Sequence, residues 1–213
     1  MNIKGILFDL DGTLLDTNTL ILESFKHTLK SHLNIEVEDR EIINSFGEPL
    51  HVTLERYSKE EVKVMLDIYR EFNIRNHDSM TKIFEGVEST LKLLKEGGFK
   101  LSIVTSKRAE VAIRGLELFN IKNYFDVIIT PECTEKHKPN PEPIIEACRI
   151  IGVNPSECIM VGDSKYDMLC GERAGAYTCL VSYTAIDINS FDGINPNFKI
   201  NKLDEILDIV HLI

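Results

Sequence analysis

The sequence is short of positive charge and of long apolar runs. Its 213 residues contain 24 lysines and arginines against 34 aspartates and glutamates, which gives a net charge of −10. A nucleic-acid surface needs clustered lysine and arginine to displace counterions, so we expect no nucleic-acid partner. The longest apolar runs are only a few residues, far below the roughly 20 that a membrane-spanning helix requires. We therefore expect no membrane-embedded segment.

The sequence also lacks paired cysteines, histidines at metal-binding spacing and glycine-rich nucleotide loops. Its five cysteines are widely spaced with no C-x-x-C pair, which argues against a disulfide framework or a zinc site and favours a reducing cytosol. The segment before Asp9 is too short for a signal peptide, so we expect a cytoplasmic protein. No P-loop or G-x-G-x-x-G motif occurs, and ATP or NAD binding is therefore not expected.

What the sequence does contain is the composition of a globular protein, 43% hydrophobic and 27% charged. After Gly86, short apolar runs alternate with segments of helical periodicity. We expect strands at 3–8, 101–104, 127–129, 159–161 and 178–181, and helices at 87–95, 109–119, 142–151, 166–174 and 203–210. Strands that alternate with helices predict an α/β fold, in which a parallel sheet is covered on both faces.

The first third of the chain has a different pattern. Helical periodicity occurs at 20–33 and at 59–76, and no convincing strand lies between Asp16 and about Met80. We therefore expect an all-helical insert at residues 17–80, after the first strand. The core would then be formed by residues 1–16 and 81–213.

Polar residues cluster where four of the predicted strands end. Ligands bind at the carboxyl ends of strands in an open parallel sheet, so the four clusters should converge on one crevice. The first cluster contains Asp9 and Asp11, whose side chains point the same way because residues two apart in an extended chain share a face. One aspartate can attack phosphorus, while the other can protonate the leaving group and then activate water. Taken alone, this pattern could equally be a polar turn that caps a helix.

The second and third clusters can bind an anion. Thr105-Ser106-Lys107 offers hydroxyl groups and the N–H groups of a helix start, which suit a phosphoryl group but also an ordinary N-cap. The third cluster, KPNP, contains Lys138, a compact point charge that can hold a phosphate beside a nucleophilic carboxylate. Most lysines are surface residues, so this cluster alone indicates little.

The fourth cluster can bind a metal ion. Asp163 follows a strand and Asp167 comes one helical turn later, which suits a hard cation with oxygen ligands, although a capped helix start has the same pattern. In one crevice, Asp9, Asp11, Asp163 and Asp167 would repel each other. A divalent cation together with Lys138 removes that repulsion and also neutralises an incoming phosphate.

The segments DLDGT, IVTSK, KPNP and GDSKYD, in this order, resemble those of the haloacid dehalogenase (HAD) superfamily of phosphatases. The resemblance implies a Rossmann-like core and a helical cap at about residues 17–80 that closes over the substrate. It implies that Asp9 is the nucleophile and Asp11 the general acid and base. Thr105, Ser106 and Lys138 would bind the phosphoryl group.

The same resemblance implies one cofactor, Mg²⁺. The ion would be held by Asp9, the backbone carbonyl of Asp11 and Asp163, with Asp167 supporting from nearby. Oxygen ligands alone do not distinguish magnesium from manganese.

Within the superfamily the chain looks most like the PpaX-type inorganic pyrophosphatases. The matching stretches are NIKGILFDLDGTLLDTN, YREFNIRNHD and KPNPEP. The alternative is a phosphoglycolate phosphatase or another small phosphomonoesterase, which shares the catalytic motifs and the style of the GEPL loop at Gly47–Leu50. Two departures from the pyrophosphatase pattern are GEPL in place of GPSL and Tyr183 in place of an indole.

Pyrophosphate also needs cationic help for its leaving phosphate. The insert offers five candidate cations, Arg56, Arg70, Arg75, His27 and His77, although most such residues simply solvate helix faces. Gly47, Arg70 and His77 are the candidate substrate contacts. A sugar phosphomutase is a less favoured hypothesis, because the insert lacks a lysine- and arginine-bearing segment near residues 45–52. A non-catalytic binding protein is less favoured still, since each required catalytic residue is present. The pattern leaves monomer and homodimer equally open.

Overall fold

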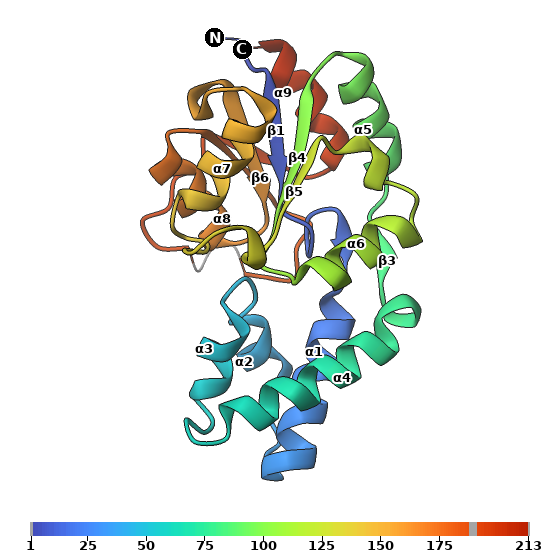
Figure 1. Cartoon of the computed structure of the whole chain (residues 1–213), viewed down its shortest axis with the longest axis vertical. Coiled ribbons are helices and arrows are strands. Elements are labelled where there is room, and N and C mark those ends of the chain that lie inside the picture. The colour runs from blue at the N-terminus through green and yellow to red at the C-terminus, as the bar shows by residue number, and fades with distance from the viewer. Residues whose placement is uncertain (1, 188–190, 213) are drawn as a thin grey trace.

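The computed structural model describes residues 2–187 and 191–212. Six parallel strands form one sheet in the order β5-β4-β1-β6-β7-β8. Their bounds are β1 Gly5–Phe8, β4 Lys100–Val104, β5 Val127–Ile129, β6 Cys158–Gly162, β7 Tyr177–Val181 and β8 Phe198–Ile200. Parallel neighbours require crossover connections, and the connections that join β1, β4, β5, β6 and β7 along the chain contain helices. The predicted α/β fold is therefore confirmed, with the sheet and its helices at one end of the molecule (Figure 1).

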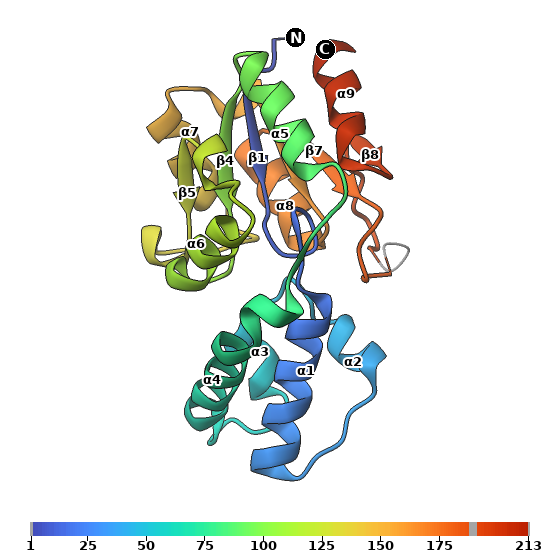
Figure 2. The same cartoon turned by 90° about the vertical axis from the view of Figure 1, so that its right-hand side faces the viewer.

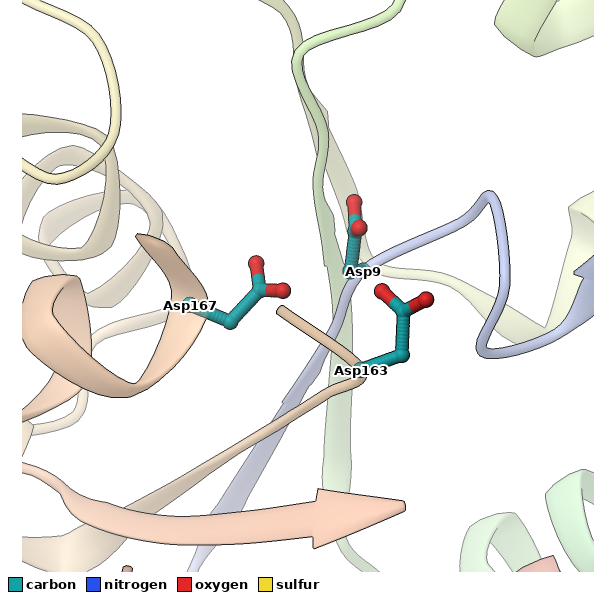
Figure 3. A group of neighbouring side chains, drawn as sticks. All are labelled: Asp9, Asp163 and Asp167. Atoms are coloured by element: carbon teal, nitrogen blue, oxygen red, sulfur yellow. The ribbon is translucent and has the colours of Figure 1, made fainter. Parts of the chain in front are cut away.

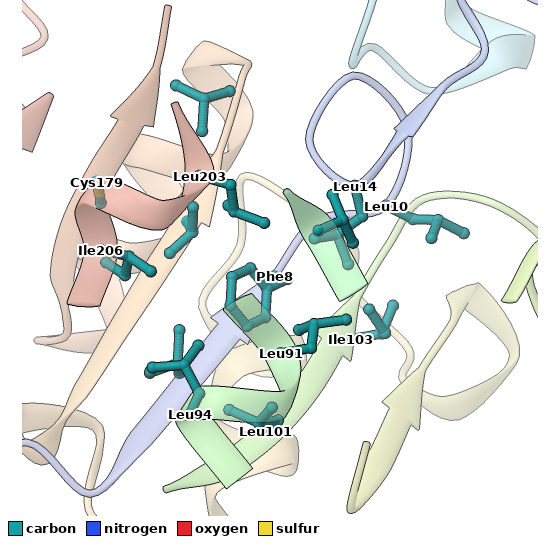
Figure 4. Packing of buried hydrophobic residues seen from close by; sticks show 14 of the residues in the cluster. Phe8, Leu10, Leu14, Leu91, Leu94, Leu101, Ile103, Cys179, Leu203 and Ile206 are labelled. Carbon is teal, nitrogen blue, oxygen red and sulfur yellow. The ribbon is translucent and has the colours of Figure 1, made fainter. Parts of the chain in front are cut away.

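Different helices cover the two faces of the sheet. Side chains alternate along β1, so Ile6 and Phe8 belong to one buried cluster and Leu7 to another. The cluster around Phe8 includes residues of α5, α6 and α9 (Figure 4), and the cluster around Leu7 includes residues of α7 and α8. These helices are α5 Val87–Glu96, α6 Ala109–Leu118, α7 Glu142–Ile151, α8 Lys165–Ala174 and α9 Ile206–Leu212. Strand β1 is therefore buried on both faces.

Residues 18–80 form a separate helical region below the sheet in Figures 1 and 2. Its helices are α1 Asn18–Thr28, which continues as a π-helical turn at Leu29–Leu33, α2 Asp39–Ile43, α3 Leu50–Glu55 and α4 Val62–Met80. The region has its own buried cluster, which includes Phe25, Leu54 and Met65. Two short antiparallel strands, β2 Leu15–Asp16 and β3 Lys82–Ile83, connect it to the sheet.

Several elements differ from the sequence prediction. Strand β8 and the short helices α2 and α3 were not predicted, and the helix expected at 59–76 is α4 at Val62–Met80. The helix expected at 203–210 is a 3₁₀ turn at Leu203–Glu205 followed by α9. Further 3₁₀ turns lie at Lys122–Tyr124, Pro131–Cys133 and Pro155–Glu157. Within the described part of the chain, no helix is both long and apolar enough to cross a membrane.

Candidate active site

A cavity of about 350 Å³ lies between the carboxyl ends of the central strands and the helical region. Residues at the strand ends and residues of the helical region both line this cavity. The sheet side contributes Asp9, Asp11, Gly12, Thr105, Ser106, Lys107 and Asp163, and the helical region contributes residues that include Phe25, Phe46, Gly47, Glu48, Tyr69 and Arg70. Residues of the first, second and fourth predicted clusters therefore meet at one cavity, whereas Lys138 and Asp167 lie outside its lining and reach it through the contact of Lys138 with Asp9.

Asp9 follows the last residue of β1 and is almost fully buried, with 7% of its surface exposed. Its backbone N–H donates to the Val161 carbonyl at 2.9 Å, which holds this turn against β6. Gly12, three residues later, has a φ of 77°, and a Cβ there would lie 2.1 Å from Asp163 Oδ2. Glycine is therefore required at this position both for backbone conformation and for the close approach of Asp163.

Lys138 is buried next to Asp9, outside the cavity lining, and connects three groups there. Its buried Nζ donates to Asp167 Oδ1 at 2.6 Å and to the Val104 carbonyl at 3.0 Å. Nζ also lies 2.9 Å from Asp9 Oδ1 as an ion pair, but outside hydrogen-bonding angles, so this Asp9 oxygen has no hydrogen-bond partner among the described residues. Burial alone would lower the pKa of Lys138, but Asp167 and Asp9 together raise it above its ordinary value.

The carboxylates of Asp9, Asp163 and Asp167 are buried and form an acidic cluster (Figure 3). One oxygen from each lies within 4.8 Å of the others. Burial raises the pKa of Asp9 to about 7, with Lys138 opposing the rise and Asp167 adding to it. Burial, then Asp167 and Asp9, also raise the pKa of Asp163. When ionised, the three carboxylates carry more negative charge than one lysine neutralises, and this set of oxygen donors therefore fits a divalent cation such as Mg²⁺.

The three carboxylates have different partners. Asp163 Oδ2 accepts a hydrogen bond from Thr184 Oγ1 at 2.7 Å. Asp167 Oδ1 binds Lys138, while its Oδ2 accepts from the backbone N–H and the hydroxyl of Ser164, at 3.0 Å and 2.6 Å. The contacts of Asp167 therefore fix the position of Lys138, in addition to placing a carboxylate in the acidic cluster.

The Asp11 carboxylate lies outside this acidic cluster of described residues. It accepts hydrogen bonds from Lys107 Nζ, at 2.8 Å and 3.0 Å, and from Thr17 Oγ1 at 2.7 Å. Lys107 was not predicted as a site residue. Its position directly after Thr105-Ser106 was the only sequence signal, and most lysines at such positions face solvent.

Thr105 and Ser106 both line the cavity. Thr105 is buried, and its Oγ1 accepts from the Lys107 backbone N–H at 3.1 Å, a contact typical of a turn that starts a helix. This contact leaves the hydroxyl proton of Thr105 free to be donated, because a hydroxyl group can donate and accept at once.

Of the three candidate substrate contacts in the helical region, Gly47 and Arg70 line the cavity. His77 does not, and its predicted role as a substrate contact is not supported. Its side chain is fully buried, its Nδ1 lies 2.8 Å from Asp78 Oδ1, and Asp78 in turn lies 2.8 Å from Arg114 Nε of α6. These contacts attach the end of α4 to the sheet side of the molecule.

Glu48 is a further cavity residue that the sequence did not reveal. Its carboxylate accepts from Thr53 Oγ1 at 2.8 Å and from Tyr166 Oη at 3.2 Å, and it pairs with Arg56. Tyr166 belongs to α8, so Glu48 connects the Gly47–Leu50 loop of the helical region to a helix of the sheet. The neighbouring Gly47 also packs closely against the sheet side, since a Cβ at this position would lie 2.6 Å from Ser164 Cβ.

Comparison with known proteins places this geometry in a family. A relative from Clostridium perfringens, provisionally named pyrophosphatase PpaX, is 49% identical, with 98% of this chain and 97% of the relative covered. The pyrophosphatase PpaX of Halalkalibacterium halodurans is 40% identical over 99% of this chain and 98% of its own. The crystal structure of a predicted phosphatase from Clostridium acetobutylicum has a TM-score of 0.89, with 28% identity and full coverage of both chains.

The family match covers the strands and loops that build the cavity. Residues 6–181 match the haloacid dehalogenase-like hydrolases, and this range contains Asp9, Asp11, Thr105, Lys138 and Asp163. With this match over most of the chain, and with full-length relatives well above 30% identity, the protein belongs to the haloacid dehalogenase-like hydrolase family.

Proposed function

We propose that this chain is a Mg²⁺-dependent phosphohydrolase that works through an aspartyl-phosphate and hydrolyses inorganic pyrophosphate to phosphate. The observation that carries the proposal is the position of Lys138, which pairs with both Asp9 and Asp167 beside a buried acidic cluster. A lysine so placed opposes the rise in the pKa of Asp9 that burial causes, which favours the charged, nucleophilic form, and it offers a cation to the incoming phosphate. The pyrophosphatase names of two full-length relatives support the choice of substrate.

In the first half-reaction a carboxylate oxygen of Asp9 attacks one phosphorus atom of pyrophosphate. The bond from that phosphorus to the bridging oxygen breaks, and Asp11 supplies a proton to the departing phosphate. In the second half-reaction Asp11 takes a proton from a water molecule, whose oxygen attacks the phosphorus and releases Asp9. Thr105, Ser106 and Lys138 bind the phosphoryl oxygens during both steps.

The cation that the acidic cluster fits would neutralise charge on the transferred phosphoryl group. Asp9, the backbone carbonyl of Asp11 and Asp163 would hold it, with Asp167 in support. Lys107 is the cation best placed for the leaving phosphate, because its Nζ contacts the proton donor Asp11 and lines the cavity. Arg70, which is more exposed, would contact the same phosphate from the helical region.

We further propose that residues 17–80 act as a cap over the cavity, and that the remaining residues form the catalytic core. Gly47, Glu48 and Arg70 of this cap face the carboxylates of the core across the cavity. A cytoplasmic location is also part of the proposal, because all five cysteines are free thiols, as in a reducing compartment.

A phosphoglycolate or related monoester phosphatase is the second candidate. The observation that favours it is the position of the GEPL loop on the cavity, since this loop has the phosphoglycolate phosphatase style. Such a substrate would need a cation for its carboxylate, which Arg70 could supply as readily as it binds a second phosphate.

The test is a comparison of kcat/KM in Mg²⁺ buffer for pyrophosphate, phosphoglycolate, glucose 1-phosphate and an aryl phosphate, with Asp9→Asn as the blank. We expect pyrophosphate to have the highest value. A preference for phosphoglycolate would overturn the substrate but keep the mechanism. Turnover of none of the four would overturn the proposal as a whole.

A further inference from the structure

The segment that follows β7 returns toward the cavity and contacts one carboxylate of the acidic cluster. Thr184 Oγ1 donates to Asp163 Oδ2 at 2.7 Å and accepts from the Ile186 backbone N–H at 3.2 Å. A threonine hydroxyl has a single proton, so a hydroxyl that donates to Asp163 is held by the second contact in that orientation. The Asp163 side chain is therefore held by a hydrogen bond from Thr184, a residue outside the cavity lining and separate from Lys138.

The residues on either side of Thr184 are anchored in different parts of the molecule. Tyr183 packs against the core cluster that contains Phe8, and its Oη donates to the Thr13 carbonyl at 2.9 Å. Its ring also packs on Phe84, with ring centroids 4.9 Å apart. These contacts fix the segment to the turn that carries Asp11 and to the chain just after β3.

Ile186 is anchored on the other side of the cavity. Its side chain is buried, with 8% exposed, and it belongs to the same hydrophobic cluster as Phe46, Leu54 and Met65 of the helical region. The chain around it belongs to the sheet side, between β7 and β8. Within four residues, one segment thus joins the sheet core, a carboxylate of the acidic cluster and the core of the helical region.

We propose that Thr184 is a positioning residue for Asp163, and that Ile186 makes the orientation of Asp163 depend on the packing of the helical region. The metal affinity of the acidic cluster should then respond to a hydrophobic contact that does not touch it. Outer-shell hydrogen bonds to metal ligands typically change metal affinity by about 10-fold to 100-fold, which sets the size of the effect. This inference rests on the magnesium site of the proposed function.

The experiment is a calorimetric titration of MgCl₂ into EDTA-treated, full-length protein without substrate. Thr184→Val removes the hydroxyl at nearly constant volume, and we expect its Mg²⁺ Kd to rise at least about 10-fold. Thr184→Ser retains the hydroxyl and should stay within about 3-fold of the wild type, whereas a role of the threonine in packing alone would affect both variants. A Thr184→Val variant with the wild-type Kd would overturn the inference.

The second arm compares two truncations of the same hydrophobic cluster, each measured below its metal-free melting temperature. Ile186→Ala should raise the Mg²⁺ Kd several-fold, while Met65→Ala, which truncates the cluster from α4, should not. An equal rise for both variants would overturn the coupling through Ile186, because it would reflect general loosening of the helical region. Absence of Mg²⁺ binding to the wild type would instead refute the magnesium part of the proposed function.

Discussion

The Nζ atom of Lys107 lies 2.8 Å and 3.0 Å from the two carboxylate oxygens of Asp11. Both side chains are mostly buried, with 10% of the Lys107 side chain and 21% of the Asp11 side chain exposed. Solvent therefore screens this ion pair less than it screens a surface pair. In the proposed mechanism the pair acts on the leaving group, whereas Lys138 acts on the attacked phosphoryl group.

We predict that Lys107→Met lowers kcat/KM for pyrophosphate by about 100-fold, the lower end of the usual cost of removing one group that stabilises developing negative charge. The aryl phosphate should lose less than about 10-fold, because its leaving group carries less negative charge than a departing phosphate. The measurement is kcat/KM for both substrates, with Lys122→Met as control, since Lys122 pairs with Glu117 outside the cavity. Equal losses on both substrates would contradict a role at the leaving group.

Replacing the nucleophile should separate activity from folding. Asp9→Asn cannot form the aspartyl-phosphate, and we expect kcat to fall by on the order of 10⁴-fold or more, as is usual when a nucleophile is removed. Its far-ultraviolet circular dichroism spectrum should match that of the wild type, since an amide fits the space of the carboxylate. Activity at the wild-type level in this variant would disprove the covalent mechanism.

The stability of the metal-free protein should depend on pH through Asp9. Its pKa is raised from 3.8 to about 7 on folding, so the folded state holds a proton that the unfolded state has lost within this range. The stability that this proton provides is complete below about pH 4 and is lost as the pH rises to about 7. In EDTA, the melting temperature of Asp9→Asn should therefore rise by several degrees relative to the wild type between pH 4 and pH 8. Saturating Mg²⁺ should reduce that difference, and a constant difference across the range would contradict this prediction.

Gly12→Ala should destabilise the protein more than a matched glycine variant. Both Gly12 and Gly98 have positive φ, 77° and 83°, so alanine costs about 1–2 kcal/mol of backbone strain at either position. At Gly98 the new methyl group enters open space, whereas at Gly12 it collides with Asp163 Oδ2. We expect urea unfolding to give the larger loss for Gly12→Ala, together with loss of activity in that variant alone. Equal losses of stability would show that Asp163 moves aside without cost.

Chelation provides a prediction about the cofactor. Treatment with EDTA should abolish hydrolysis, and added Mg²⁺ should restore it, because three buried carboxylates exceed the charge that Lys138 neutralises. The control is EDTA premixed with excess Mg²⁺, which should have no effect. Full activity in metal-free buffer would remove the metal from the mechanism.

The strands that carry the site were predictable because each is a short apolar run that ends at polar residues. β8 was missed because it has three residues and its Lys199 is exposed, so it carries too little apolar pattern. Helices α2 and α3 have five and six residues, which is less than two turns and too short to establish a helical period. Local pattern therefore identified the strands from the edge strand β5 to β7, but not the edge strand β8 or the smaller helices.

For the candidate site, sequence identified residue types but not side-chain environments. Asp9, Lys138, Asp163 and Asp167 were expected together, and the structure brings them together. His77 was expected at the cavity, but its face of α4 packs toward Gly115, a tertiary contact that helical periodicity does not encode. Lys107 and Thr184 gain their roles from partners 96 and 21 residues away, and no single-sequence pattern indicates such pairs.

The paired strands β2 and β3 place the two chain connections of the helical region next to each other, at Leu15 with Ile83 and Asp16 with Lys82. A segment whose ends meet in this way can be exchanged for another of different length without any change in the strand order of the sheet. The half of the cavity that the helical region forms can thus be replaced as one segment while the carboxylates of the sheet side stay in place. Ile186 limits such an exchange, because it packs into the helical region but lies more than 100 residues after that region in the sequence. Any transplanted helical region would have to present an apolar pocket to this isoleucine.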